Sequence, residues 1–512
     1  MKKRQPTKGE QSVDESRFRQ AVADTGRGGG VSFLALLLGK GASSGLHVML
    51  ARFLEPAGYG LFALGRAIMN VGDGVARLGT DVGVVRLVSK EHTTGDKQEA
   101  AAIFQTAVVV TIAGSFVVAV ILYFGAPLLN EYFEGPGFVT IMRWFAISLP
   151  AYALLTVMTS VLQARKYIFD QQTIIRLISP VIKISVIGGV FLLGWRLRGA
   201  VIAFAVSGVL SVAWSIWTIR TRLPELFSKL KVKFRTRKLL RYSIPVLLAG
   251  IGSMMAMRVD KILLGYLSTS KQIGIYAVAA LIGKNITVIK AAIMPVLKPV
   301  ISEIYEVDQE KWESDQFERF YQLVKRWTFV LTLIIILPIV AFPEVILQIF
   351  GNEYTSGKLV LVCFLGYGLV RTGVGPTMAG LKMTGHQDQE LINGLILLVS
   401  VASLDYMLIP KFGALGAALG TLIATIIVET IRAVEIYRYH KFSVINKNHT
   451  IIMVAGLIII WVAYIGSEVT FILKLAYVTV SAITLTVLFY VLREEDDKIV
   501  VQMVQHKILG NG

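Results

Sequence analysis

Apolar stretches separated by short clusters of charge, glycine and proline fill almost the whole chain. They lie at 29–52, 59–85, 100–124, 138–163, 172–195, 199–219, 242–266, 273–300, 327–350, 359–381, 389–409, 413–437, 449–466 and 470–492. A helix that crosses a bilayer needs ~20 residues, and continuous apolar runs of this length do not alternate as barrel strands do. The pattern therefore predicts an all-α integral membrane protein with about 14 transmembrane helices.

The composition excludes several protein classes. Hydrophobic residues make up 54% of the 512 residues and charged residues only 17%, whereas a soluble domain carries about 25% charged residues. The net charge of +18 falls mostly in short loops, where it reports topology and not a nucleic-acid partner. The single cysteine, Cys363, excludes a disulfide framework, and no spacing of ligands predicts a metal site.

The loop charges predict the topology. Lys and Arg number about 33 in the loops on the side of the termini and about 6 on the other side, which is the positive-inside pattern. Both termini are therefore expected to be cytoplasmic, in the cell membrane. The predicted domains are a mobile cytoplasmic N-terminal arm (1–28), an N-lobe of helices 1–6 (29–220), a basic cytoplasmic linker (221–241), a C-lobe of helices 7–12 (242–440), helices 13–14 (441–495) and a cytoplasmic tail (496–512).

Two separate motifs repeat along the chain. FLEPAGYGLFAL, around Gly60, is similar to YLSTSKQIGIYAV, around Gly274, and RGAVIAFAVSG, around Gly199, is similar to FGALGAALGTL, around Gly413. Both pairs are separated by 214 positions, which indicates a duplication. Six spans per half keep the same orientation, so we expect two parallel six-helix lobes around a central cavity, with alternating access by rocking of the lobes.

Many cations lie inside the apolar stretches, where each would cost ~3 kcal/mol at the centre of a lipid-facing helix. They must therefore face a wet cavity, pair with acids or reach an interface. A cation-rich cavity suits a substrate with several negative charges, such as phosphate or pyrophosphate. The candidate phosphate-binding residues are Lys40, Arg66, Arg176, Lys183, Arg258, Lys261, Lys284, Lys290 and Arg371.

A smaller set of charges has the spacing of ion pairs. Asp73, Arg77 and Asp81 follow at intervals of four residues along one helix face, which fits either a structural salt-bridge ladder or a coupling site. Arg66 has no acid within one turn and is the better ligand candidate. The other predicted members are Asp260, beside Arg258 and Lys261, and the pair of Glu429 with Arg432, for which a structural role is favoured.

The opening spans resemble a known family. RFLEPAGYGLFAL, followed closely by RLVSKE, resembles the start of polysaccharide-biosynthesis transporters, and DKILLGYLSTSKQIGIYAVAALI and GALGAALGTLIA resemble the second half. These transporters are the O-antigen and teichoic-acid type flippases of the multidrug/oligosaccharidyl-lipid/polysaccharide exporter superfamily. The resemblance implies two six-helix lobes with two optional C-terminal helices. It also implies a polyprenyl-(di)phosphate-linked oligosaccharide as substrate, with glycosyltransferases and a glycan polymerase as partners.

Two other functions remain open. A cation-coupled exporter of small cationic compounds would need an ionisable carboxylate early in each lobe, whereas the first span offers Lys40. A membrane glycosyltransferase or glycan polymerase would need acids and bases at a membrane surface, and the loops here are short. We therefore expect no enzyme activity and no cofactor. Sodium, protons and the membrane potential all remain candidates for the driving force.

Overall fold

The computed structural model describes residues 8–94, 97–133, 135–227, 234–292, 294, 315–465, 470–492 and 497, with side chains from Gly39 onward. All its regular elements are helices, and the described ranges contain no strand. This confirms the expected all-α class. Most of the C-terminal tail and part of the basic linker lie outside the described residues. The predicted N-terminal arm is helical from Lys8 onward.

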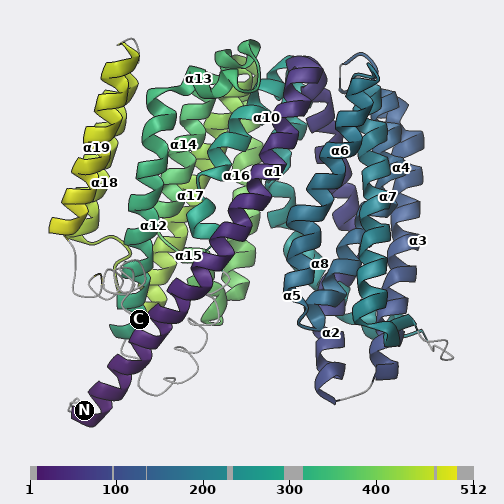
Figure 1. Ribbon diagram of the computed structural model, residues 1–512, viewed down its shortest axis with the longest axis horizontal. Helices are drawn as coiled ribbons and strands as arrows, with labels where there is room; N and C mark the ends of the chain where they lie inside the picture. The colour runs from purple at the N-terminus through teal and green to yellow at the C-terminus, as the bar shows by residue number, and fades with distance from the viewer. Residues whose placement is uncertain are drawn as a thin grey trace.

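The first bundle of helices, on the right in Figure 1, contains most of the first half of the sequence, while the N-terminal part of the first helix runs from the lower left to the upper centre of the view. A kink at Glu55 and Pro56 divides its first helix into two arms, because proline has no N–H to donate to the helix ladder. The helix as a whole packs on α3, α4, α6 and α7. The elements are α1 (Lys8–Ala76), α2 (Thr80–Thr94), α3 (Lys97–Leu129), α4 (Phe138–Ala164), α5 (Ile168–Thr173), the π-helix η1 (Ile174–Ile178), α6 (Ser179–Leu192), α7 (Leu197–Arg222) and η2 (Pro224–Phe227).

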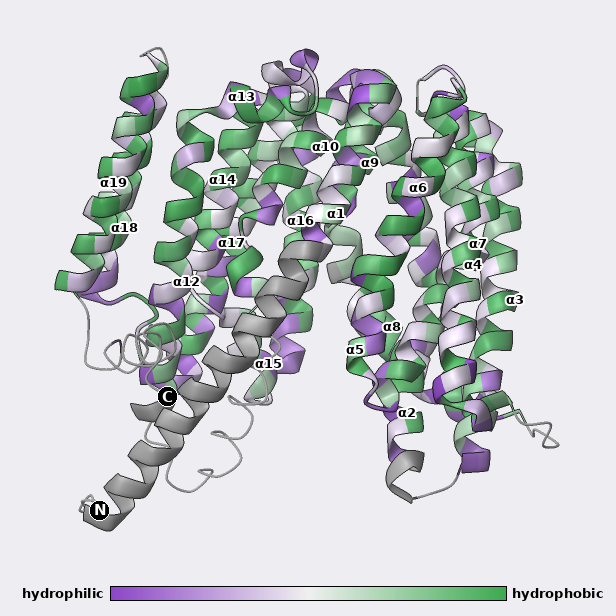
Figure 2. Cartoon of the chain, viewed as in Figure 1, coloured by the Kyte–Doolittle hydropathy of each residue, from purple (hydrophilic) through white to green (hydrophobic). Residues whose placement is uncertain are grey.

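The second bundle contains the second half, and its C-terminal helix pair packs against the outside of α12. In Figure 2, hydrophobic residues dominate the length of these helices and hydrophilic residues gather near both ends of the molecule. The elements are α8 (Thr236–Ala256), α9 (Val259–Leu267), α10 (Ser270–Asn285), α12 (Asp315–Ala341), α13 (Pro343–Gln348), η3 (Asn352–Gly357), α14 (Lys358–Gly373), α15 (Thr377–Met383), α16 (Gln387–Phe412), α17 (Ala414–His440), α18 (Lys447–Ile465) and α19 (Phe471–Val491).

Nine helices in the described part are long and apolar enough to cross a membrane, or up to eleven if each bent pair counts as one span. The remaining predicted spans, at 29–52, 59–85 and 273–300, correspond to the two arms of α1 with the start of α2, and to α10 with the residues after it. These are segments that carry several of the candidate cations, which lower their apolarity. The predicted total of about 14 spans therefore stays a prediction.

The two bundles meet most closely where the repeated motifs cross. A Cβ atom added to Gly60 of α1 would overlap the Ser270 carbonyl oxygen, and one added to Gly274 of α10 would overlap the Pro56 carbonyl oxygen. Pro56 and Ser270 are themselves 214 positions apart, as are the two glycines. The contact is therefore reciprocal, as expected if an approximate two-fold axis relates the duplicated halves.

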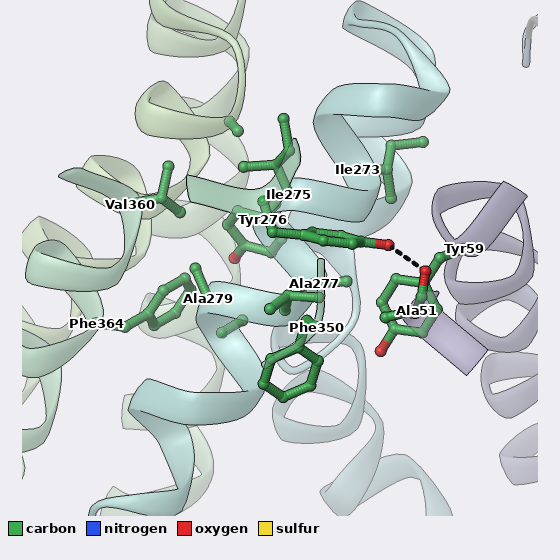
Figure 3. Close-up of a cluster of buried hydrophobic side chains, with 14 of the residues drawn as sticks. Ala51, Tyr59, Ile273, Ile275, Tyr276, Ala277, Ala279, Phe350, Val360 and Phe364 are labelled. Carbon is green, nitrogen blue, oxygen red and sulfur yellow. Dashed lines mark hydrogen bonds between the residues drawn. The ribbon is translucent and has the colours of Figure 1, made fainter. Parts of the chain in front are cut away.

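An apolar cluster surrounds this crossing at the upper end of the molecule. Figure 3 shows Tyr59 and Ala51 of α1 near Ile273 and Ala277 of α10, with Phe364 of α14 on the far side. The Tyr354 hydroxyl donates a hydrogen bond to the Ala51 carbonyl at 3.2 Å, and the Arg52 side chain donates to the Ile349 carbonyl at 2.7 Å. These contacts join the two bundles at the kink of α1.

We predict that Gly60→Ala and Gly274→Ala each destabilise the protein. The added methyl group would force α1 and α10 apart, and overpacking of this kind costs about 1–3 kcal/mol. Thermal unfolding in detergent measures the effect, and the reciprocal geometry predicts similar losses for the two variants. Gly189→Ala is the control, because its added Cβ would have no atom within 4 Å. Equal stability of all three variants would contradict the tight crossing.

Candidate functional site

A cavity of about 230 Å³ lies between the two bundles, beneath the apolar cluster. His47, Tyr59, Arg66 and other residues of α1 form one wall. The facing wall comes from the start of α9 and from α10, including Lys261, Lys284 and the residue before α9, Arg258. Four of the nine predicted cations therefore line one cavity: Arg66, Arg258, Lys261 and Lys284.

Arg66 is supported by an aromatic ring and not by an acid. Its guanidinium lies over the Phe204 ring of α7, 5.5 Å from the ring centroid. Lys183 of α6 lies over the same ring at 5.6 Å and over the Tyr152 ring at 4.9 Å. Neither cation forms an ion pair within the ranges that the structure describes. Because the face of a ring attracts a cation without cancelling its charge, the charge of Arg66 remains available to an anion in the cavity. Lys183 is not among the residues that line the cavity.

One carboxylate, which does not itself line the cavity, binds a cation of the opposite wall. Asp260 is buried, and it accepts hydrogen bonds from the Tyr276 hydroxyl at 2.7 Å and from the Lys284 ammonium at 3.2 Å. It also accepts one from the backbone N–H of Lys261 at 2.8 Å. Arg258 and Lys261 have no side-chain ion pair among the described residues. The wall therefore keeps an excess of positive charge.

A ring nitrogen and a hydroxyl complete the upper part of the cavity. The His47 Nδ1 and the Tyr59 hydroxyl are 2.9 Å apart, so the two side chains satisfy each other. Asn70 and Asn285 add amide groups to the lining. The cavity can therefore bind an anion through its cations and a neutral polar group through its amides.

Two further candidate cations, Lys290 and Arg371, lie at the break between α14 and α15. The Lys290 ammonium donates to the carbonyls of Arg371 at 2.5 Å and Gly375 at 2.6 Å, where α14 ends before α15. Arg371 donates to the Tyr367 hydroxyl at 2.7 Å and lies 3.7 Å from Glu429. Lys40 and Arg176, the last two candidates, do not line the cavity. They lie where α1 packs on η1, since a Cβ atom added to Gly39 would lie 2.8 Å from the Cβ of Arg176.

Glu429 belongs to a buried cluster of charges inside the second bundle. Arg432 pairs with Glu429 at 2.9 Å and with Glu390 at 2.6 Å, and the Thr377 hydroxyl donates to Glu429 at 2.8 Å. The sequence places Glu429 and Arg432 one turn apart, but Glu390 lies on another helix. The arrangement fits the structural role that the spacing favours.

Arg77 lies between the two carboxylates that the sequence placed around it. Its guanidinium is 2.6 Å from Asp81 and 3.3 Å from Asp73. The three residues follow the end of α1 into α2, where Leu78 and Gly79 have positive φ angles and interrupt the helix. The ladder therefore joins the two helices across this interruption.

Asp405 is a buried acid to which the sequence assigned no role. It is fully buried in α16, and neither carboxylate oxygen has a hydrogen-bond partner among the described residues. The side chain is near Asp260 and Lys284, and it contacts α17 so closely that a Cβ added to Gly420 would overlap its Oδ1. The only sequence signal is an isolated acid within an apolar run. Its neighbours are far away along the chain.

Comparison with known proteins gives the family. A family model described as polysaccharide biosynthesis protein matches residues 49–358, more than half of the chain. The chain belongs to the polysaccharide biosynthesis protein family. This confirms the resemblance found in the sequence. No curated protein sequence matches the chain.

Solved structures show the same fold at low sequence identity. The lipid II flippase MurJ, in an inward closed conformation, has a TM-score of 0.65 and 15% identity, covering 90% of this chain and 98% of that chain. The Vibrio cholerae MATE transporter VcmN, in a mutant form, has a TM-score of 0.60 and 14% identity, covering 82% and 98%. A MOP superfamily transporter from Pyrococcus furiosus, described as having a binding pocket of reverse polarity, has a TM-score of 0.53 and 14% identity, covering 89% and 100%.

The family model gives the family, and the fold is the one found in solved structures of membrane transporters, including a member of the MOP superfamily. The same fold occurs in a lipid II flippase and in a transporter described as a multidrug resistance MATE family member. The fold therefore does not choose between the two substrate classes. The chemistry of the cavity has to make that choice.

We predict that Glu429→Ala strongly destabilises the protein. Removal of the carboxylate leaves Arg432, Arg371 and Lys290 near one another in a buried site, and breaking a buried ion pair costs about 3–5 kcal/mol. Glu344→Ala is the control, because its pair with Lys358 lies at the surface and is worth about 0–1 kcal/mol. Thermal unfolding measures the stability of both variants. An equal loss of stability in the two would contradict the structural role of Glu429.

Proposed function

We propose that this protein moves a polyprenyl-(di)phosphate-linked oligosaccharide from the cytoplasmic to the outer leaflet of the cell membrane, for the assembly of a surface polysaccharide. The observation that supports the proposal most directly is the set of four cations that line the cavity, Arg66, Arg258, Lys261 and Lys284. One buried carboxylate, Asp260, binds Lys284. A phosphate or diphosphate headgroup supplies several negative charges. Arginine binds it through paired N–H donors, and lysine binds it as a point charge.

The transport step follows from the arrangement of the bundles. The contacts around Gly60 and Gly274 close the upper end of the cavity in this conformation. Rocking of one lobe on the other would open that end and close the opposite one. The lipid tail would stay in the bilayer while the charged headgroup crosses through the cavity. No covalent bond changes in this step, so the proposal needs no enzymatic chemistry and no cofactor.

The topology and partners belong to the same proposal. We place both termini in the cytoplasm, since the Lys and Arg residues of the loops are concentrated on that side. The lobes of the transport step are 29–220 and 242–440, with 441–495 added to the second lobe. Glycosyltransferases would supply the lipid-linked glycan at the cytoplasmic side, and a glycan polymerase would consume it outside.

We further propose that a sodium ion or a proton at Asp260 and Asp405 drives the transport. Asp405 has two buried oxygens without hydrogen-bond partners in the described part of the chain, and a buried ionised carboxylate is costly unless a cation or a proton compensates it. Lys284 connects this pair of acids to the cavity, because its ammonium is bound to Asp260 and also lines the cavity. An ion at the acids would thereby change the charge that Lys284 presents to the substrate.

We expect Arg66→Ala and Arg258→Ala to reduce flipping sharply. A hydrogen bond to a charged group contributes about 1.5–3 kcal/mol, so each substitution should lower substrate binding roughly tenfold or more. The measurement is the movement of a fluorescent polyprenyl-diphosphate-linked glycan in proteoliposomes. Arg66→Lys should retain part of the activity, and Arg196→Ala, at an exposed position, should retain all of it.

The same variants separate this proposal from the alternative exporter. Unchanged flipping in both alanine variants would contradict the role of the cations. Resistance of expressing cells to cationic drugs, lost in Asp405→Asn but retained in Arg66→Ala, would favour a cation-coupled multidrug exporter. Turnover of a sugar donor by the purified protein would instead indicate an enzyme.

We expect Asp405→Asn to remove the dependence of flipping on an ion gradient. The amide keeps the shape of the side chain but neither accepts a proton at its oxygens nor carries the charge that binds sodium. Flipping rates are measured with a sodium gradient and, separately, with a pH gradient across the vesicle membrane. Asp170→Asn is the control, since Asp170 pairs with Arg222 at the end of α7. Gradient-dependent flipping in Asp405→Asn would exclude this site.

A further inference from the structure

A second basic hollow lies at the foot of α8, and its lining shares no residue with the cavity between the bundles. Its volume is about 910 Å³, and it is lined by Arg235, Arg237, Lys238 and Arg241 together with Glu99 of α3. The transport mechanism above does not use any of these residues. Their density in one hollow calls for a ligand or a structural explanation.

The charges within the hollow do not balance. Glu99 is the one acid in its lining, and this carboxylate is already shared by Arg235 at 2.7 Å and Lys238 at 2.9 Å. Arg237 and Arg241 are exposed and form no ion pair with any residue that the structure describes. Two guanidinium groups therefore remain on the rim, beside two cations that Glu99 holds in place. This arrangement suits an anion with at least two oxygen acceptors.

The position of the hollow indicates a lipid as the source of that anion. It lies where α3 and α8 begin, and both belong to candidate membrane spans. Tyr242 lines it and accepts Arg86 on its ring face at 5.0 Å, while Phe234, at its edge, is 60% exposed. Aromatic side chains beside basic ones are typical of the headgroup level of a membrane. Basic pockets at this level bind anionic lipid headgroups.

At its foot, α8 also contacts the first bundle. The backbone N–H of Arg235 donates to the buried Thr106 hydroxyl of α3 at 2.9 Å, and Ser243 packs against Gly79 and Gly83 near α2. Higher up, Gly252 of α8 packs against Leu395 of α16. The lower part of α8 thus contacts the first bundle and the upper part contacts the second.

We propose that this hollow binds the phosphate headgroup of an anionic membrane phospholipid through Arg237 and Arg241, and that the bound lipid stabilises the packing of α8 on α3. Arg235, Lys238 and Glu99 act as positioning residues that fix the rim of the hollow. A ligand that binds the folded protein but not the unfolded protein raises the unfolding temperature. The lipid composition of the membrane would therefore set the stability of the α8 contact.

The test uses the purified full-length protein in nanodiscs of phosphatidylcholine with or without phosphatidylglycerol. We expect phosphatidylglycerol to raise the unfolding temperature of the wild type, with one tightly bound molecule seen by native mass spectrometry. The double variant Arg237→Gln/Arg241→Gln should weaken that binding about tenfold for each arginine. Arg237→Lys/Arg241→Lys should recover part of it.

A matched control separates local binding from total charge. Arg196→Gln/Arg198→Gln removes two exposed cations at the start of α7, away from the hollow, and should bind phosphatidylglycerol like the wild type. If both double variants weakened phosphatidylglycerol binding equally, the proposal would be overturned, because the binding would then depend on the total charge of the protein and not on this hollow. A response to soluble glycerol phosphate that equals the response to phosphatidylglycerol would overturn the lipid as the ligand. Flipping assays are not needed, so the outcome is independent of the proposed transport.

Discussion

The cost of placing cations inside a membrane is the constraint on which the rest of the structure depends. Each one would cost ~3 kcal/mol on a lipid-facing helix, so every cation in a span has to be compensated or hydrated. The protein uses three kinds of compensation. Aromatic faces support Arg66 and Lys183, backbone carbonyls hold Lys290, and carboxylates bind Lys284 and Arg371. The first kind leaves the positive charge in place, which is what a site for an anion requires.

The two halves of the duplication differ in their buried acids. At the 214-residue offset, the buried acids Asp260, Asp405 and Glu429 correspond to Leu46, Phe191 and Ser215. Among the candidate phosphate-binding cations, Arg66 and Lys183 of the first half lie over aromatic rings, whereas Lys284 and Arg371 of the second half lie near carboxylates. Arg77 of the first half, which belongs to the ion-pair set, is bound by two carboxylates. Under the proposed ion coupling, the charge that depends on the ion would lie on one wall of the cavity only. An ion bound in the second half would change the balance of charge across the cavity without altering the wall that contains Arg66.

Much of the fold could be predicted from the sequence because its signals are local. Apolar length indicates each span, and the repeat places Gly60 and Gly274 at equivalent positions of two halves. The partners of each cation could not be predicted in this way. Phe204 lies on a different helix from Arg66, and Glu390 is 42 residues from Arg432. Such contacts depend on the packing of helices that are distant in sequence, for which a single sequence gives no signal.

The same difference explains what became of the nine candidate cations. A cation in an apolar run indicates only that it needs compensation, and several arrangements can supply it. Lys284 and Lys290 lie six residues apart on neighbouring turns, yet one lines the cavity and the other holds the break after α14. Their roles differ because they meet different partners on the neighbouring helices. Lys284 binds the carboxylate of Asp260 in α9. Lys290 binds two backbone carbonyls, one in α14 and one in the turn after it. The α14–α15 break exists because Gly375 and Pro376 interrupt the helix, and the carbonyls that this interruption frees need a donor. The carbonyls at the helix break and the half-buried ammonium of Lys290 therefore satisfy each other, which gives Lys290 a structural role that is independent of any substrate.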